Sequence, residues 1–220
     1  MVDSVPPAVQ RVIVNPGHGL GNTRVGVFDE GASSPFGREA GIVDDIATRV
    51  VDHYWKPHTD TCTSPHGVTV IPTPICNEAC GAQHARTSHL SYVIGWINEV
   101  ALKVKGGYVD VVLSIHMDSL DAKYSGTLVV IDDRAGVKRY HEAQEIAKTV
   151  SQVLGLPNRG VLTDKKTPRR SIAIVEKTRP PAFLIELGNI QNERDVLAVR
   201  ECGAQAVIAV IERLARKHGR

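Results

Sequence analysis

Short apolar runs alternate with longer amphipathic stretches along most of this chain. Each apolar run is bounded by glycine, proline or polar residues, a pattern that predicts buried strands. We expect these strands at 11–15, 68–72, 110–118, 127–131, 172–175 and 182–187, with the weakest signal at 172–175.

Between the strands, apolar residues recur at spacings of three and four, which is typical of a helix with one buried face. The first helix, expected from about Arg38 to Tyr54, has Ile42, Val43 and Ile46 on this face. Further helices are expected at 83–104, 138–154 and 202–217, with a long glycine-rich loop at 17–37. This alternation predicts an α/β fold, a three-layer α/β/α domain whose mostly parallel or mixed twisted sheet has helices on both faces.

The 220 residues are 42% hydrophobic and 23% charged, which suits one substantial core. We expect a short tail over residues 1–10 and a single domain over 11–220. The 26 basic and 24 acidic residues are spread out except near 165–170, so no nucleic-acid surface is expected. No run is long enough for membrane insertion, and the first residues do not resemble a secretory signal. We therefore expect a monomer that is made in the cytoplasm without a signal peptide, or a secreted mature form.

Two histidines and two glutamates lie where predicted strands give way to loops or helices. His18 follows the first strand, Glu39 lies in the first turn of the first helix, His116 lies near the end of a later strand, and Glu186 ends another. The carboxyl ends of neighbouring strands in an open α/β sheet converge on one crevice. Two imidazoles and one carboxylate leave zinc an open position for water, as in a catalytic site. The sequence therefore predicts a metal-dependent hydrolase.

His18 and Glu39 also have purely structural explanations. A histidine between glycines can cap a turn, and the helix dipole favours an acid such as Glu39 in the first turn. The same strand-end setting at both His18 and His116 favours metal ligands instead. An ionised Glu186 inside an apolar strand is costly without a nearby cation or donor. A carboxylate beside a metal can accept a proton from the attacking water and pass it to the leaving nitrogen.

Taken together, several motifs resemble those of the zinc-dependent N-acetylmuramoyl-L-alanine amidases of the type-3 family, from about residue 11 to 215. The motifs are Asn15-Pro16-Gly17-His18-Gly19, Glu39, Ala85-Arg86, Ser114-Ile115-His116-Met117-Asp118, Asn158-Arg159-Gly160-Val161 and the segment from Pro181 to Asn192. The resemblance implies one zinc ion held by His18, Glu39 and His116, with Glu186 as the catalytic carboxylate. It also implies that the substrate is bacterial peptidoglycan, cut between the lactyl group of N-acetylmuramic acid and L-alanine of the stem peptide.

The chain departs from the family pattern at two positions expected near the substrate. Asp118 stands where the family usually has asparagine, and Asn189 where an aromatic residue is usual. Arg169 and Arg170 precede the strand of Glu186 and could pair with carboxylates of the stem peptide, although a solvated surface pair is the alternative. The segment 56–84 is less similar to the family.

That segment contains most of the cysteines. Cys76, Cys80 and His84 are spaced by four residues and would share one face of a helix. With Cys62 or His66 they could form a second, structural zinc site, or Cys62 could form a disulfide with one of the other two cysteines. Buried, unreactive thiols are the default interpretation.

We expect the enzyme to act as a phage endolysin, because a wall-degrading enzyme kept in the cytoplasm is harmless until the membrane is breached. A bacterial autolysin is the next interpretation. A zinc exopeptidase of similar fold is a further alternative, although such enzymes commonly bind two metals. A catalytically idle wall-binding protein is a fourth, and the four proposed catalytic residues argue against it.

Overall fold

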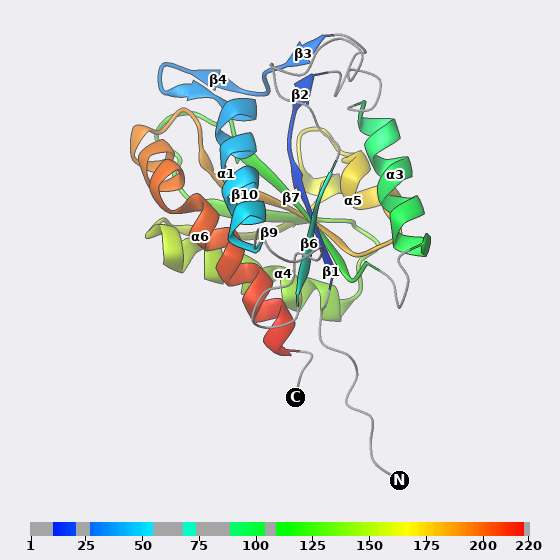
Figure 1. Ribbon diagram of the computed structural model, residues 1–220. Coiled ribbons are helices and arrows are strands. Elements are labelled where there is room, and N and C mark those ends of the chain that lie inside the picture. Colours follow the sequence, from blue (N-terminus) through cyan, green and yellow to red (C-terminus); the bar gives the residue numbers. More distant parts are fainter. Residues whose placement is uncertain (1–10, 21–26, 55–67, 74–88, 104–108, 218–220) are drawn as a thin grey trace.

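Six strands form one twisted sheet in the computed structural model, which describes residues 11–20, 27–54, 68–73, 89–103 and 109–217 (Figure 1). The strands are β1 (Arg11–Pro16), β6 (Thr69–Pro72), β7 (Val111–Asp118), β8 (Thr127–Ile131), β9 (Asn158–Thr163) and β10 (Ala182–Asn189). Their order is β6-β1-β7-β10-β8-β9. The first four in this order run parallel, β8 is antiparallel to β10, and β9 is parallel to β8. The predicted mixed sheet is confirmed.

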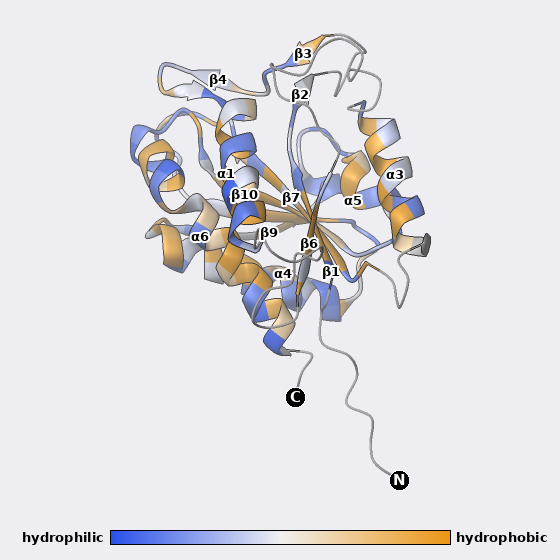
Figure 2. Cartoon of the chain, in the orientation of Figure 1, coloured by the Kyte–Doolittle hydropathy of each residue, from blue (hydrophilic) through white to orange (hydrophobic). Residues whose placement is uncertain are grey.

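Helices cover both faces of this sheet, so the three-layer architecture is also confirmed (Figure 1). One face packs against α1 (Glu39–Tyr54), α4 (Val137–Leu154) and α6 (Glu193–Lys217), and the other against α3 (Leu90–Lys103) and α5 (Ala173–Lys177). Alternate residues of a strand point to opposite faces. Val12 and Val14 of β1 therefore join the first core, whereas Ile13 joins the second. Figure 2 shows these apolar strands between helices whose outer faces are polar.

The structure corrects three expectations. The strand expected at 172–175 is wrong, because these residues contribute to the short helix α5, whose Ile174 and Val175 fill the second core. The loop expected after α4 contains β9 at the sheet edge and a 3-10 turn at Asp164–Lys166. The last helix begins at Glu193, well before 202, because the Asn192 side chain accepts the Asp195 N–H and caps its first turn.

The glycine-rich loop at 17–37 contains two short antiparallel ladders. In the first, β2 (Gly19–Leu20) pairs with β3 (Phe28–Asp29), and in the second, β4 (Ser33–Ser34) pairs with β5 (Gly37–Arg38). The first ladder sets Gly19 opposite Asp29. The loop therefore folds back over the end of β1.

None of the helices in the described part of the chain has the length and apolar character needed to cross a membrane.

Asp195 is a fully buried charge that ties α6 to the sheet. Its carboxylate accepts hydrogen bonds from the Ser125 hydroxyl at 2.5 Å, the Gly126 N–H at 2.8 Å and the Asn189 N–H at 2.9 Å. One carboxylate therefore accepts hydrogen bonds from three separate donors.

We predict that Asp195→Ala lowers the free energy of unfolding by about 3 kcal/mol, because buried donors left without an acceptor carry their desolvation cost. Urea denaturation followed by circular dichroism measures this change. Glu193→Gln, on the exposed side of the same helical turn, is the matched control and should change little. An Asp195→Ala protein as stable as the parent would contradict the assignment.

Candidate functional site

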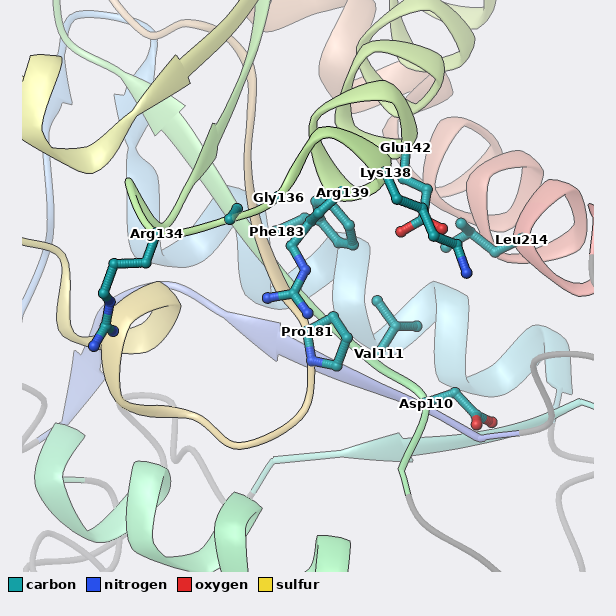
Figure 3. Close-up of a pocket in the computed structure, with 11 residues that line it drawn as sticks. Asp110, Val111, Arg134, Gly136, Lys138, Arg139, Glu142, Pro181, Phe183 and Leu214 are labelled. Carbon is teal, nitrogen blue, oxygen red and sulfur yellow. The ribbon is translucent and has the colours of Figure 1, made fainter.

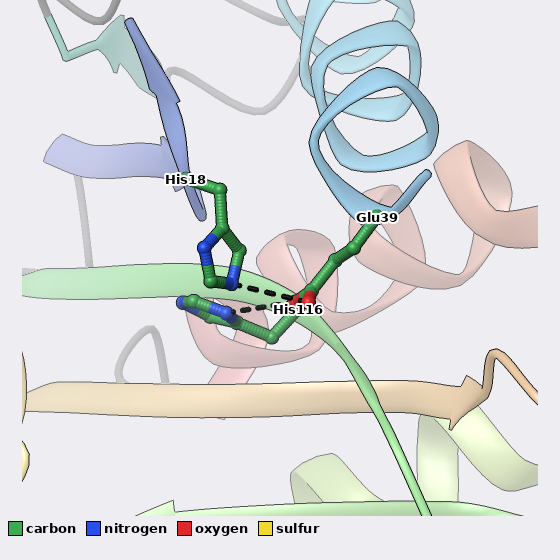
Figure 4. A group of neighbouring side chains, drawn as sticks. All are labelled: His18, Glu39 and His116. Atoms are coloured by element: carbon green, nitrogen blue, oxygen red, sulfur yellow. Dashed lines mark hydrogen bonds and ion pairs between the residues drawn. The ribbon is translucent and has the colours of Figure 1, made fainter. Parts of the chain in front are cut away.

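His18, Glu39 and His116 come together at the carboxyl edge of the parallel strands (Figure 4). His18 follows β1, Glu39 is the first residue of α1, and His116 lies on β7 next to β1. One ligand atom from each residue lies within 4.8 Å of the other two. The structure therefore brings together the three residues that the sequence suggested as metal ligands.

The Glu39 carboxylate lies at the centre of this group and is 3% exposed. Its Oε2 is 3.1 Å from His18 Nε2, and its Oε1 is 3.0 Å from His116 Nδ1. Two backbone donors also bind it, the Ala32 N–H at 2.9 Å and the Met117 N–H at 2.9 Å. These four contacts fix both oxygens between the two imidazoles.

Two glycines allow the backbone to approach this group closely. A Cβ on Gly17 would lie 2.2 Å from Cε1 of His116, so no larger residue fits without moving that ring. A Cβ on Gly31 would lie 2.6 Å from both Glu39 Oε2 and His18 Cδ2. His18 itself has a φ of 68°, a left-handed conformation that is uncommon for a residue with a side chain. The local backbone is therefore built around the imidazoles.

The charges in this group compensate one another. Burial raises the pKa of Glu39, but the hydrogen bonds and charges of His116 and His18 outweigh it and hold that pKa far below its usual range. Burial lowers the pKa of His18, yet the carboxylates of Glu39 and Asp29 bring the net shift upward. Burial lowers the pKa of His116 despite its bond to Glu39. Glu39 is therefore ionised at neutral pH, as a metal ligand must be.

The donor set fits a zinc ion. Imidazole nitrogens and a carboxylate oxygen are common zinc ligands, and three protein ligands leave one position open. The nitrogen–oxygen separations of 3.0 and 3.1 Å let a single ion contact these atoms together. Within the described residues this is the one group of His, Cys, Asp or Glu side chains that could hold a metal.

Glu186 lies beside this group on the neighbouring strand. β10 pairs with β7 in parallel, and Glu186 is opposite His116 in the register, so both side chains point to the same face of the sheet. Its Oε2 is buried and makes no hydrogen bond with the described residues. Burial, together with the charges of Glu39 and Asp118, raises the pKa of Glu186 well above its usual range. A carboxylate whose pKa is raised in this way suits a general base and acid.

Three further charged residues, Asp118, Arg159 and Arg169, influence Glu186 electrostatically. Asp118, at the end of β7, accepts a hydrogen bond from Arg159 Nη1 of β9 at 2.8 Å. The positive charges of Arg159 and Arg169 both lower the pKa of Glu186, in opposition to its burial. Arg169 thus acts on the site electrostatically, whereas the carbonyl of Arg170 accepts a bond from Lys165.

Asn189 is buried, and its side chain is fully hydrogen-bonded to neighbouring loops. Its side chain is fully buried, and its amide donates to the carbonyls of Leu120, Asp121 and Tyr124. Its Oδ1 accepts the N–H groups of Leu120 and Gln191. These bonds fix the loop after β7, so Asn189 has no free donor for a substrate and we no longer expect a substrate contact there.

The sequence predicted no individual role for two residues that lie at the site. Asp29 Oδ2 lies 3.0 Å from His18 Nδ1, and Arg159 pairs with Asp118. Arg159 lies in a motif of the resemblance, but Asp29 gave no signal because its position depends on how the loop folds. Cys62, Cys76, Cys80 and His84 lie outside the described residues, as does most of the segment 56–84.

A separate pocket of about 400 Å³ lies at the opposite edge of the sheet, where β7 and β10 begin (Figure 3). Asp110 and Pro181 precede those two strands, and Arg139 of α4 points into the pocket. The pocket shares no residue with the histidine–glutamate group. The reactive residues therefore lie at the carboxyl edge of the strands and outside this pocket.

Comparisons with known proteins agree with this arrangement. The family profile described as N-acetylmuramoyl-L-alanine amidase matches residues 12–212. None of the curated proteins matches the sequence.

Solved structures share the fold at low sequence identity. The catalytic domain of the CD27L endolysin targeting Clostridia difficile is 19% identical, with a TM-score of 0.65 and a match that covers 94% of this chain and 97% of that chain. The amidase AmiC2 of Nostoc punctiforme is 22% identical, with a TM-score of 0.65 and coverage of 97% and 99%. Ami1 of Mycobacterium smegmatis is 18% identical, with a TM-score of 0.69 and coverage of 96% and 99%. Because the family profile spans most of the chain, this protein belongs to the family of N-acetylmuramoyl-L-alanine amidases.

Proposed function

We propose that this amidase is zinc-dependent and cuts the bond between the N-acetylmuramic acid lactyl group and L-alanine of the peptidoglycan stem peptide. The observation that carries the proposal is the convergence of His18, Glu39 and His116 beside Glu186, whose Oε2 has no hydrogen-bond partner among the described residues. We assign the three converging residues as zinc ligands and Glu186 as the catalytic carboxylate. A zinc ion bound there supplies Lewis acidity, which polarises the scissile carbonyl and acidifies water.

Glu186 can transfer the proton of the attacking water. Glu186 faces the same side of the sheet as His116, so its carboxylate can accept a proton from the attacking water. The carboxyl group that forms can then donate this proton to the departing alanine nitrogen. One residue thereby serves as base and then as acid.

Arginines around Glu186 suit an anionic substrate. Stem peptides carry carboxylates, and Arg169 lies exposed within electrostatic reach of His116 and Glu186. Asp118 and Arg159 form an ion pair near Glu186, and both side chains are partly exposed. We propose that Arg169 and this pair contact the stem peptide, and that Arg170 does not.

We further propose that the enzyme acts as an endolysin in host lysis, with a bacterial cell-wall amidase as the second candidate. The fold likeness to the catalytic domain of the CD27L endolysin supports the first role, and the likeness to the bacterial amidases supports the second. Produced inside a bacterium whose wall it degrades, an endolysin should cause lysis only after the membrane is permeabilised. Lysis without permeabilisation would favour the second role.

The bond assignment can be tested on purified sacculi. We predict new free L-alanine amino termini and intact glycan strands, measured by mass spectrometry of the released fragments. The metal-free protein, prepared with a chelator, should release none, and added zinc should restore release. Cleaved glycan strands or peptide cross-links in place of the alanine termini would overturn the assignment.

Substitutions should separate the metal ligands from the catalytic carboxylate. We predict that Glu186→Gln lowers kcat by about 10²–10⁴-fold, the usual contribution of a general acid–base group, while zinc content stays unchanged. His18→Ala and His116→Ala should instead lose zinc, measured by elemental analysis of the purified proteins. Full turnover by Glu186→Gln would sink the proposed role of this residue.

Desolvation of the Glu186 carboxylate should also lower the folded stability in a pH-dependent way. Below the unfolded pKa of about 4.5 the carboxyl is protonated in both states, and there is no penalty. As pH rises above that value the unfolded chain ionises more readily than the folded one, so folded stability falls. We predict that metal-free Glu186→Gln melts at a higher temperature than the parent at pH 7.5, and that this gain disappears near pH 4.5.

Thermal unfolding in the presence of a chelator measures the effect. The exposed Glu201→Gln, on α6, is the control and should show no such gain. Equal or lower thermal stability of Glu186→Gln at pH 7.5 would contradict the desolvation penalty.

Arg169 and Arg170 form a matched pair for testing substrate contacts. We predict that Arg169→Ala raises KM about fivefold on stem peptides with free carboxylates, because an exposed ion pair contributes about 1 kcal/mol. Arg170→Ala should leave KM unchanged. With amidated stem peptides the two variants should behave alike, and a KM increase that persists there would count against a carboxylate contact.

A further inference from the structure

The four residues from Asp29 to Ala32 contact two of the three proposed metal ligands. Asp29 Oδ2 lies 3.0 Å from His18 Nδ1, on the side of the ring away from Glu39. Ala32 donates its N–H to Glu39 Oε2 at 2.9 Å. One short segment of the loop therefore reaches the outer side of both side chains.

Asp29 is itself held in place. The ladder between β2 and β3 sets Asp29 opposite Gly19, the residue after His18. Its Oδ1 accepts the Gly31 N–H at 3.0 Å, and its Oδ2 lies 3.0 Å from Nδ1 of the imidazole, a charge contact that does not have hydrogen-bond geometry. The side chains of His18 and Asp29 are 9% and 17% exposed, so water screens their contact weakly.

Gly31 completes the segment. Its φ of 67° is left-handed, and its Cα lies so close to His18 and Glu39 that an added Cβ would approach both at 2.6 Å. The backbone at Gly31 therefore lies between His18 and Glu39. The turn there places Asp29 against His18 and Ala32 against Glu39.

We propose that Asp29 is a positioning residue that fixes the ring orientation and tautomer of His18. A neutral imidazole carries one N–H, and a carboxylate beside Nδ1 favours the tautomer with the hydrogen there. The lone pair of Nε2 then faces Glu39, where the proposed ion binds. Outer carboxylates that hold a metal-binding histidine in this way typically contribute 10- to 100-fold to metal affinity. This inference rests on the zinc site of the proposed function.

The test is the zinc dissociation constant of the full chain, measured by competition with a chromogenic chelator. Asp29→Ala should bind zinc about 10- to 100-fold more weakly than the parent. Asp29→Asn retains an acceptor oxygen without the charge and should fall between the two. Glu30→Gln is the matched control, because Glu30 pairs with the exposed Arg38 and should leave zinc affinity unchanged.

Two further measurements separate the possible causes. Thermal unfolding of the metal-free proteins reports any loss of fold, and if Asp29→Ala fails to fold then Asp29→Asn provides the comparison. Nitrogen-15 chemical shifts of the His18 ring in the metal-free protein, at a pH where the ring is neutral, should show a protonated Nδ1 in the parent and a loss of that preference in Asp29→Ala. Zinc affinity of a folded Asp29 variant within twofold of the parent, or a protonated Nε2 in the parent, would overturn the inference.

His18→Ala distinguishes this inference from the proposed function. If His18→Ala loses zinc while Asp29→Ala retains full affinity, the zinc site stands and the role of Asp29 is wrong. If His18→Ala itself retains zinc, the proposed site fails, and the inference about Asp29 fails with it.

Discussion

The buried carboxylate of Glu39 connects three separate parts of the chain and determines how the site is arranged. A buried charge is costly unless cations or hydrogen-bond donors compensate it. Here two backbone N–H groups, from Ala32 and Met117, and two imidazoles, from His18 and His116, surround the carboxylate. The loop after β1, the start of α1 and the end of β7 must therefore meet at one point. Each of these segments supplies one proposed ligand. The contacts that compensate the Glu39 charge therefore also bring the three proposed ligands together.

The sheet topology adds Glu186 to this group. His116 and Glu186 lie opposite each other on adjacent parallel strands, and the alternation of side chains places both on the same face. A shift of one residue in this register would turn Glu186 into the core beside α1, α4 and α6. The large apolar residues of β10, Phe183 and Ile185, fill that core and exclude such a shift. The packing of the core thus fixes the position of the proposed catalytic carboxylate.

Several features of the site oppose stability. His18 has a left-handed backbone. Glu186 has a buried Oε2 that makes no hydrogen bond with the described residues, and its pKa is raised. Strained or unsatisfied groups of this kind concentrate at functional sites, where the surrounding structure must hold them. The two well-packed cores and bonded networks such as that of Asp195 provide this support. The features that weaken the fold locally are the ones that suit metal binding and proton transfer.

The sequence by itself determined the fold class and the order of most strands and helices, and it predicted the four residues that we propose for the site. This was possible because hydrophobic periodicity and strand-end positions are local properties, and because the motifs around His18, His116 and Glu186 are specific in combination. It misassigned 172–175, where a short apolar run fits a strand as well as the helix that packing selected. Only the tertiary structure decided that Asp29 lies against His18, that Arg159 reaches Asp118, and that Asn189 supports a loop. Those contacts join residues far apart along the chain or across a folded loop, so the three-dimensional packing determines them and no local pattern encodes them.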